Sequence, residues 1–158
     1  MSPKASSVLI VEDDDTKRRR ISAVLERQLP NAVVTTRRSY QGAVAALDEH
    51  PFDLVVLDMT LPTFDREVGE SGGRPRVFGG RDLLGEISSK ELTCAVLVVT
   101  QYERFSDSNE SKTLSQLRTE LSQAFPRQFK GAIYYSSMQS DWERRLAKRI
   151  DSLTNRLR

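Results

Sequence analysis

The chain has 158 residues, of which 38% are apolar and 29% charged, and its formal net charge is +2. These values are ordinary for a globular domain, and the near balance of charge gives no indication of nucleic-acid binding. The single cysteine, Cys94, excludes a disulfide framework within the chain. The apolar runs are too short to span a membrane, so we expect one cytoplasmic domain over residues 7–158 behind a disordered polar tail, residues 1–6.

Five short apolar runs have the composition of strands. Several are continuous rather than alternating, which is typical of parallel strands that are covered on both faces. The fifth run is richer in aromatic residues than the others. In chain order the runs are Ser7–Val11, Ala32–Thr36, Phe52–Asp58, Cys94–Thr100 and Gly131–Ser137.

Helical patterns separate these runs, and each has a recognisable start. A capping box of Ser140 and Glu143 marks the last helix most clearly. The expected starts are a cap at Asp15, a cap at Ser39, the Gly79-Gly80 pair, Ser111 and Ser140. Strands that alternate with helices predict an α/β fold, a doubly wound sheet of five parallel strands with helices on both faces.

The segment Val8–Asp15, "VLIVEDDD", places four carboxylates directly after an apolar run. Carboxylates are favourable at the start of a helix, so the run can be read as a solvated helix N-terminus. It can also be read as part of a cation site, because crowded carboxylates beside a core need a neutralising charge. The segment alone does not decide between the two interpretations.

The other strand ends favour the cation site. Asp58 ends the third expected strand, Thr100 the fourth, and Ser136 and Ser137 the fifth. The carboxyl ends of parallel strands lie at one edge of the sheet, where ligands bind in such folds. Converging oxygen atoms suit Mg²⁺, and a carboxylate beside such an ion can act as a nucleophile toward phosphorus.

Three motifs in this order, "VLIVEDDD", "FDLVVLDMTLP" and "VLVVT", resemble the receiver domain of two-component response regulators. The resemblance covers almost the whole chain and implies a flavodoxin-like (βα)5 fold. It implies that Asp58 is the phosphoacceptor and that Thr100 is the switch hydroxyl. It also implies that Glu12 and Asp13 hold Mg²⁺, with Asp13 as the direct ligand.

The resemblance extends to less central positions. The metal would also be held by Asp58 itself and by the backbone carbonyl of Thr60. Asp14 matches a position that is often acidic, and either Tyr134 or Tyr135 would be the aromatic residue that rotates on activation. The basic run Lys17–Arg20 lies on the first helix, where the family meets its phosphodonor, and it can equally be a solvated basic face.

The chain departs from the family pattern in three ways. The lysine that normally ends strand five is replaced by Ser136 or Ser137, and Lys130 precedes the expected strand by too far to substitute. Gln101 stands where the family has a small residue, and it would narrow access to the phosphoacceptor. The segment 63–80 is longer than usual, and we expect a loop there that acts as a lid or a docking surface.

These features favour a stand-alone receiver that takes a phosphoryl group from a histidine kinase or phosphotransfer protein and signals to an unknown downstream protein. We expect no direct contact with nucleic acid or membrane, and no enzymatic activity beyond self-phosphorylation and slow autodephosphorylation. The alternative is a pseudo-receiver that binds partners without phosphorylation. A metal-dependent phosphatase fits less well, because such enzymes place a second aspartate where this chain has Thr60.

Overall fold

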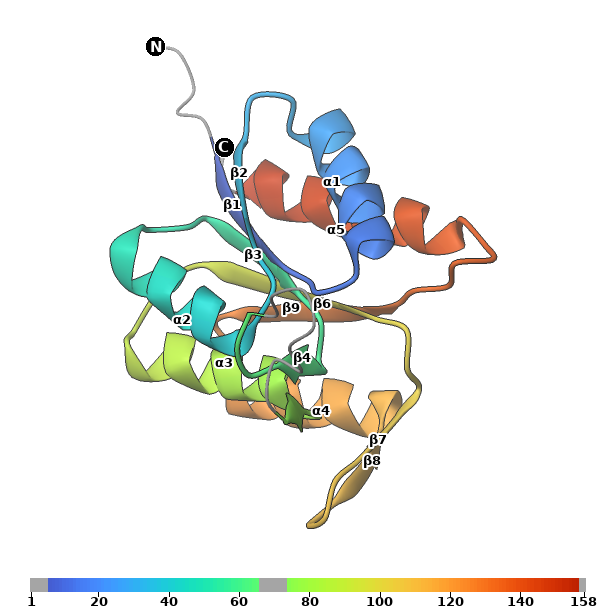
Figure 1. Ribbon diagram of the computed structural model, residues 1–158. Coiled ribbons are helices and arrows are strands. Elements are labelled where there is room, and N and C mark those ends of the chain that lie inside the picture. The colour runs from blue at the N-terminus through green and yellow to red at the C-terminus, as the bar shows by residue number, and fades with distance from the viewer. Residues whose placement is uncertain (1–5, 66–73, 157–158) are drawn as a thin grey trace.

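The computed structural model describes residues 6–65 and 74–156 and contains a central sheet of five parallel strands (Figure 1). The strand order is β2-β1-β3-β6-β9. After β2 is added on one side of β1, the later strands β3, β6 and β9 are added on the other side. This doubly wound arrangement confirms the predicted fold class. The strands are β1 (Ser7–Val11), β2 (Val33–Arg37), β3 (Leu54–Leu57), β6 (Ala95–Thr100) and β9 (Phe129–Tyr134).

Within the described residues, five helices cover the two faces of this sheet. Helices α1 (Asp15–Gln28) and α5 (Asp141–Arg156) pack side by side on one face. The opposite face is covered by α2 (Tyr40–Glu49), α3 (Gly79–Ser89) and α4 (Leu114–Ala124) (Figure 1). Ser39 caps α2 as predicted, since its side chain accepts a hydrogen bond from the Gly42 N–H.

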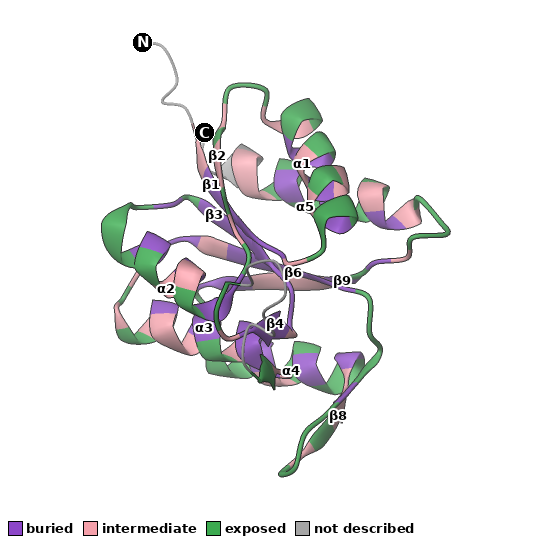
Figure 2. Cartoon of the chain, viewed as in Figure 1, coloured by how far each residue is buried: buried purple, intermediate pink, exposed green. Residues whose placement is uncertain are grey.

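The sheet separates two apolar cores. Val8 and Ile10 of β1 face the core beneath α1 and α5, whereas Leu9 and Val11 face the core beneath α2, α3 and α4. All four side chains are fully buried, and the central strands are the most buried part of the chain (Figure 2). Burial on both faces is the reason that these strands are continuous apolar runs. Cys94 is buried in the core beneath α2, α3 and α4.

Two small antiparallel hairpins lie outside the main sheet. One pairs β4 (Leu61–Pro62) with β5 (Pro75–Arg76), and the other pairs β7 (Arg104–Ser106) with β8 (Ser111–Thr113). The second hairpin projects beyond α4 (Figure 1).

The β7–β8 hairpin corrects the predicted start of the fourth helix at Ser111. The Asp107 carboxylate accepts hydrogen bonds from the N–H groups of Asn109 and Glu110, and this closes the turn between the two strands. Helix α4 begins only at Leu114, behind a capping box of Thr113 and Gln116. Other boundaries move by one to three residues: β2 and β9 differ from their predicted ranges, and the two glycines at 79 and 80 lie inside α3.

Strand β9 lies at one edge of the sheet, and arginine side chains cover part of that edge. The Arg118 guanidinium of α4 donates two hydrogen bonds, of 2.9 and 3.1 Å, to the Ala132 carbonyl oxygen. Arg149 of α5 donates to the Lys130 carbonyl oxygen at 3.4 Å. Two carbonyl groups of this edge strand are therefore bound by side chains of the same chain.

The predicted tail and the predicted loop are only partly described. Residues 1–5 of the tail and 66–73 of the loop lie outside the described residues. In the rest of the loop, Pro75–Arg76 form β5, which pairs with β4 just before the loop, and Gly79 and Gly80 begin α3. In the part of the chain that the structure describes, no helix has the length and apolar character needed to cross a membrane.

Candidate functional site: the carboxyl edge of the parallel sheet

Three of the predicted site residues come together where β1, β3 and β6 end. Glu12 directly follows β1, Asp58 directly follows β3, and Thr100 is the last residue of β6. They are buried, with exposed fractions of 3%, 7% and 0%. The Asp58 N–H donates to the Val11 carbonyl oxygen at 3.2 Å, which continues the pairing of β3 with β1 to the site itself.

The ammonium group of Lys17 lies between the two buried carboxylates. Its Nζ atom is 2.6 Å from Glu12 Oε1 and 3.0 Å from Asp58 Oδ2, and Lys17 is only 1% exposed. Neither Lys17 Nζ nor Glu12 Oε1 makes a hydrogen bond of standard geometry within the described residues. The contact is therefore an electrostatic bridge that joins the ends of β1 and β3.

The remaining carboxylate oxygens accept backbone hydrogen bonds. Glu12 Oε2 accepts from the Asp14 N–H at 3.0 Å, and Asp58 Oδ1 accepts from the Met59 N–H at 2.7 Å. Each carboxylate thus uses one oxygen for the backbone and the other for Lys17. This arrangement fixes the orientation of both side chains.

The charges in the site are not fully balanced. Burial disfavours the charged ammonium of Lys17, but Asp58 and Glu12 outweigh this effect and raise the pKa of Lys17 above its usual value. Desolvation raises the pKa of Glu12 to about 7, and the neighbouring charge of Asp58 adds to this despite the opposing effect of Lys17. One ammonium thus faces two buried carboxylates, and both the burial and the charge of Asp58 disfavour the ionised form of Glu12.

The start of helix α1 brings Lys17 into the site. The Asp14 side chain, at the N-cap, accepts a hydrogen bond from the Lys17 N–H at 2.8 Å. Lys17 is the third residue of the helix, and long side chains on a helix lean back toward its N-terminus. The lysine therefore reaches over the first turn toward the ends of β1 and β3.

The N-cap at Asp14 corrects the prediction that Asp15 caps this helix. Asp15 is the first helical residue, and its carboxylate pairs with Arg18 at 2.6 Å and with Arg38 at 2.8 Å. The hydrogen bond from Arg18 is the main reason that the pKa of Asp15 is lowered. Only Asp14 has the extended backbone that lets a side chain turn back to bond the first turn.

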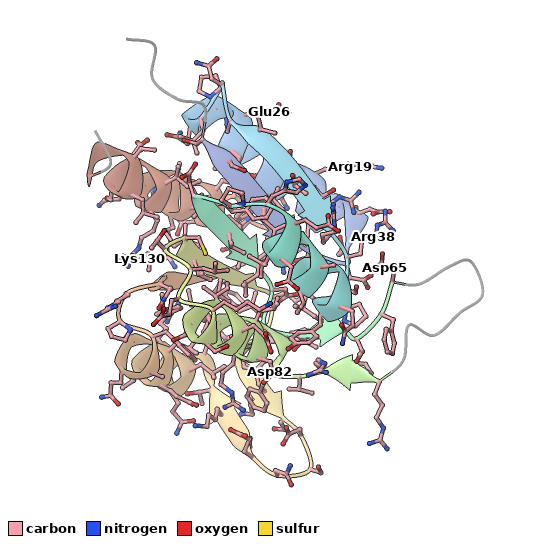
Figure 3. All side chains as sticks on the ribbon, turned by 90° about the vertical axis from the view of Figure 1, so that its left-hand side faces the viewer. Arg19, Glu26, Arg38, Asp65, Asp82 and Lys130 are labelled. Atoms are coloured by element: carbon pink, nitrogen blue, oxygen red, sulfur yellow. The ribbon has the colours of Figure 1, made fainter. Side chains whose placement is uncertain are left out.

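Lys17 is not among the site residues predicted from the sequence, although its spacing in the helix carries a signal. Lys17 lies four residues before Ile21 and seven before Val24, both of which are buried under the sheet. That spacing puts Lys17 on the buried face of the helix. The run Lys17–Arg20 is thus not a uniform basic face, because only Arg19 is fully exposed, and it points outward (Figure 3).

Arg20 is also directed inward, and it contacts residues after β9 and in the first turn of α5. It lies over the rings of Tyr135 and Trp142, at 5.4 and 5.1 Å from the ring centroids. Its guanidinium also donates to Glu143 Oε1 at 3.1 Å. Three of the four basic residues, Lys17, Arg18 and Arg20, therefore form ion pairs within the domain.

The predicted metal ligands offer suitable oxygen atoms, but not as a formed cage. Asp13 is half-buried beside Glu12, and Thr60 is half-buried after Asp58. Carboxylate and carbonyl oxygens of this kind suit a hard ion such as Mg²⁺. Within residues 6–65 and 74–156, however, no three acidic, histidine or cysteine side chains gather into a metal-binding group. The cation that contacts Glu12 and Asp58 in this structure is Lys17.

The first turn of α3 packs tightly under the Asp58 loop. The Gly80 N–H donates to the Met59 carbonyl oxygen at 2.8 Å. A Cβ atom at Gly80 would lie 2.7 Å from the Asp58 carbonyl oxygen and 2.8 Å from Leu57 Cδ1. The Thr60 hydroxyl donates to the Val77 carbonyl oxygen at 3.0 Å, so both sides of the loop are held.

Thr100 and Gln101 lie beside the acidic residues at the end of β6. Thr100 Oγ1 accepts a hydrogen bond from the Tyr102 N–H at 3.4 Å, and the side chain is buried. Gln101 is exposed, and its amide donates to the Tyr102 hydroxyl at 3.0 Å. The glutamine is therefore directed to its neighbour along the chain.

The end of β9 carries hydroxyl groups and no ammonium group. The strand is Phe129–Tyr134, so Lys130 lies inside it and not before it as predicted. Thr100 pairs with Tyr134, which places Lys130 four residues away, about 13 Å along the strand. Figure 3 shows Lys130 on the opposite side of the domain from Arg38, which follows β2 at the site edge.

The pairing of β9 with β6 continues one residue beyond the strand, since the Tyr135 N–H donates to the Thr100 carbonyl oxygen at 2.7 Å. Ser136 Oγ accepts a hydrogen bond from the Met138 N–H, and the carbonyl oxygen of the exposed Ser137 accepts one from Arg20. Tyr135 is buried. Its ring centroid lies 4.9 Å from the ring centroid of Trp142 and 5.6 Å from Lys17 Nζ. Tyr134 is 37% exposed. Of the two tyrosines, Tyr134 is thus the one with room to change its orientation.

The model of the response regulator receiver domain matches residues 8–116 of the chain. The chain belongs to this family. The match includes all three motifs that carry the resemblance in the sequence, and it confirms that prediction. Receiver domains accept phosphoryl groups in two-component signalling, generally bind Mg²⁺, and act as signalling modules rather than as enzymes.

Known relatives of this receiver domain agree with that assignment. The Detocs response regulatory protein DtcB of Enterobacter cloacae strain JD6301 is 28% identical over 148 residues, which cover 92% of this chain and 99% of DtcB. The phosphorylated cyanobacterial phytochrome response regulator RcpA is 21% identical, covers 92% of this chain and 91% of its own, and has a TM-score of 0.61. The Mn²⁺-bound response regulator Rcp1 is 20% identical over 90% of each chain, with a TM-score of 0.60. The two structures support the flavodoxin-like fold.

Proposed function

We propose that this receiver domain accepts a phosphoryl group on Asp58 from the phosphohistidine of a histidine kinase or phosphotransfer protein in the cytoplasm, and that Mg²⁺ assists. The observation that supports this most directly is the setting of Asp58. Asp58 is the acidic residue that directly follows β3, and its carboxylate contacts the Lys17 ammonium, near Glu12 and the end of β6 at Thr100.

The transfer itself needs little more than correct placement. A carboxylate oxygen of Asp58 forms a bond to phosphorus while the bond between phosphorus and the histidine nitrogen breaks, and the electron pair stays on the imidazole. The backbone N–H of Met59 orients the carboxylate during this exchange. Mg²⁺, when it is held by Glu12, Asp13, Asp58 and the Thr60 carbonyl, offsets the negative charge that gathers between carboxylate and phosphoryl oxygens.

The charge that arrives on Asp58 gives the domain two states. We propose that the Thr100 hydroxyl turns toward the phosphoryl group and leaves its hydrogen bond with the Tyr102 N–H. The β6–α4 region and the exposed Tyr134 would then change the surface offered to a downstream protein. The end of β9 contributes no ammonium group, so this coupling relies on hydroxyl groups, with Ser136 the nearer of the two serines to the strand.

The second candidate is a pseudo-receiver that binds partners without phosphorylation. Lys17 favours this candidate, because Asp58 Oδ2 is already paired with an internal cation. A phosphatase has no comparable support, since Thr60 stands at the position of the second aspartate and its hydroxyl is bound to the Val77 carbonyl oxygen.

Labelling with small phosphodonors separates these candidates. The protein is incubated with Mg²⁺ and either acetyl phosphate or phosphoramidate, and its intact mass is measured over time. We expect the mass of one phosphoryl group to be added to the wild type, none to Asp58→Asn, and the normal amount to Asp82→Asn. Asp82 is an exposed carboxylate on α3 that pairs with Arg76, so it controls for the change of charge.

A mass gain that persists in Asp58→Asn would show that another residue is the acceptor. No mass gain with either donor would favour the pseudo-receiver.

A further inference from the structure

Lys17 enters the site from one particular side of the sheet. In the strand order β2-β1-β3-β6-β9, its ammonium bridges the ends of β1 and β3. The lysine that the family carries at the end of the fifth strand would come from beyond β6, on the other side of Asp58. Lys17 therefore occupies the side on which the carboxylates gather, where a divalent cation would have to bind.

The bridge uses two oxygen atoms that a metal ion would need. Lys17 Nζ contacts Glu12 Oε1 and Asp58 Oδ2, while the second oxygen of each carboxylate is held by a backbone N–H. A divalent ion that takes either contacted oxygen would stand next to the ammonium. Two cations at such a separation in a buried site repel strongly, so Lys17 has to withdraw.

Burial makes the position of Lys17 conditional on those carboxylates. An ammonium group that is only 1% exposed is stable only while it is paired. The face of the Tyr135 ring, 5.6 Å from Nζ, gives it one further favourable contact. Lys17 thus behaves as the resident cation of the unphosphorylated site.

We propose that Lys17 is an internal competitor of the divalent cation and sets the Mg²⁺ concentration at which this receiver domain can be phosphorylated. In the absence of metal, the ammonium compensates Glu12 and Asp58. In the presence of metal, it leaves both oxygens. The effect on phosphorylation rests on the proposed function, whereas the competition between Lys17 and the divalent ion concerns cation binding alone.

Metal binding by calorimetry tests the competition directly. Mg²⁺ and Mn²⁺ are titrated into the wild type, Lys17→Met and Arg19→Met. A nearby charge changes the proton affinity of a carboxylate roughly ten- to a thousandfold, so we expect Lys17→Met to bind both ions at least about tenfold more tightly than the wild type. Arg19→Met removes the same charge from an exposed position of the same helix and should bind like the wild type. Equal affinity of Lys17→Met and wild type would overturn the proposal.

A structure of the unmutated protein guards against a variant that fails to fold. In crystals soaked with Mn²⁺, we expect the ion at Asp58 and Lys17 Nζ displaced from both carboxylates. An ion bound to Asp58 with Lys17 still bridging Glu12 Oε1 and Asp58 Oδ2 would refute the competition, whatever the variants do.

Phosphorylation by acetyl phosphate then separates this proposal from the proposed function. Lys17→Met should reach half-maximal labelling at a Mg²⁺ concentration about tenfold lower than the wild type, with the same final extent. Loss of labelling at saturating Mg²⁺ would mean that Lys17 serves the phosphoryl group instead, and it would refute competition as its role. If neither protein is labelled although Lys17→Met binds metal more tightly, the proposed function fails and the competition stands.

Discussion

The contact between Gly80 and the loop at Asp58 can be tested by comparing Gly80 with Gly85, a second glycine of the same helix. A Cβ atom at Gly80 would meet the Asp58 carbonyl oxygen at 2.7 Å and Met59 Cα at 3.0 Å. Both are backbone atoms, so they cannot move aside as the end of a side chain can. At Gly85, in the same helix, nothing lies within 4 Å of the added atom.

The pair Gly80→Ala and Gly85→Ala isolates the cost of this contact. Alanine is favoured over glycine by up to about 1 kcal/mol in a helix interior, and this gain applies to both variants. Forcing an extra methyl group into a tightly packed place typically costs about 1–3 kcal/mol. We therefore expect Gly85→Ala to match or exceed the stability of the wild type, and Gly80→Ala to be less stable than Gly85→Ala by about 1–3 kcal/mol.

Urea unfolding followed by circular dichroism measures the free energies, and thermal unfolding provides a second measure. For a domain of this size, 1 kcal/mol corresponds to a shift of about 2–4 °C in the midpoint. Because the clash falls on the carbonyl group of Asp58, Gly80→Ala should also be labelled more slowly by acetyl phosphate than Gly85→Ala. A Gly80→Ala variant that is as stable as Gly85→Ala would refute the close packing of α3 under this loop.

The site and the core allow two further predictions. Asp14→Ala removes the N-cap of α1 and should lower the free energy of unfolding by about 1 kcal/mol. Asp15→Ala loses the ion pairs with Arg18 and Arg38 and should lower it by less in the same urea experiment. A larger loss of stability in Asp15→Ala would indicate that Asp15 is the N-cap. Burial raises the pKa of the Cys94 thiol to about 11, so the thiol is protonated at neutral pH. It should react with Ellman's reagent only as fast as the domain unfolds, and rapid reaction in native buffer would contradict its burial.

The sheet and its site edge could be predicted from the sequence because burial leaves a direct trace. Strands covered on both faces must be apolar throughout, and the carboxyl ends of parallel strands must meet at one edge. These two rules were enough to bring Glu12, Asp58 and Thr100 together. The β7–β8 hairpin was not predicted, because its strands have only three residues each and their polar composition resembles that of a loop.

Two features of the site needed more than local pattern. Three consecutive aspartates offer the same capping chemistry, and only the backbone conformation selects Asp14 over Asp15. Lys17 was grouped with its basic neighbours by composition, although helical spacing puts it on the face of Ile21 and Val24. A lysine on such a buried face is unusual unless it is paired, and the partners were the very carboxylates that had been assigned to a metal.

The arginines that cover β9 limit how this domain can associate. An uncovered edge strand is a template on which another chain can add a strand. A strand added to this edge would first have to break the hydrogen bonds from Arg118 to the Ala132 carbonyl oxygen and from Arg149 to the Lys130 carbonyl oxygen. The arginines of α4 and α5 thus protect these two carbonyl groups of the edge from strand addition.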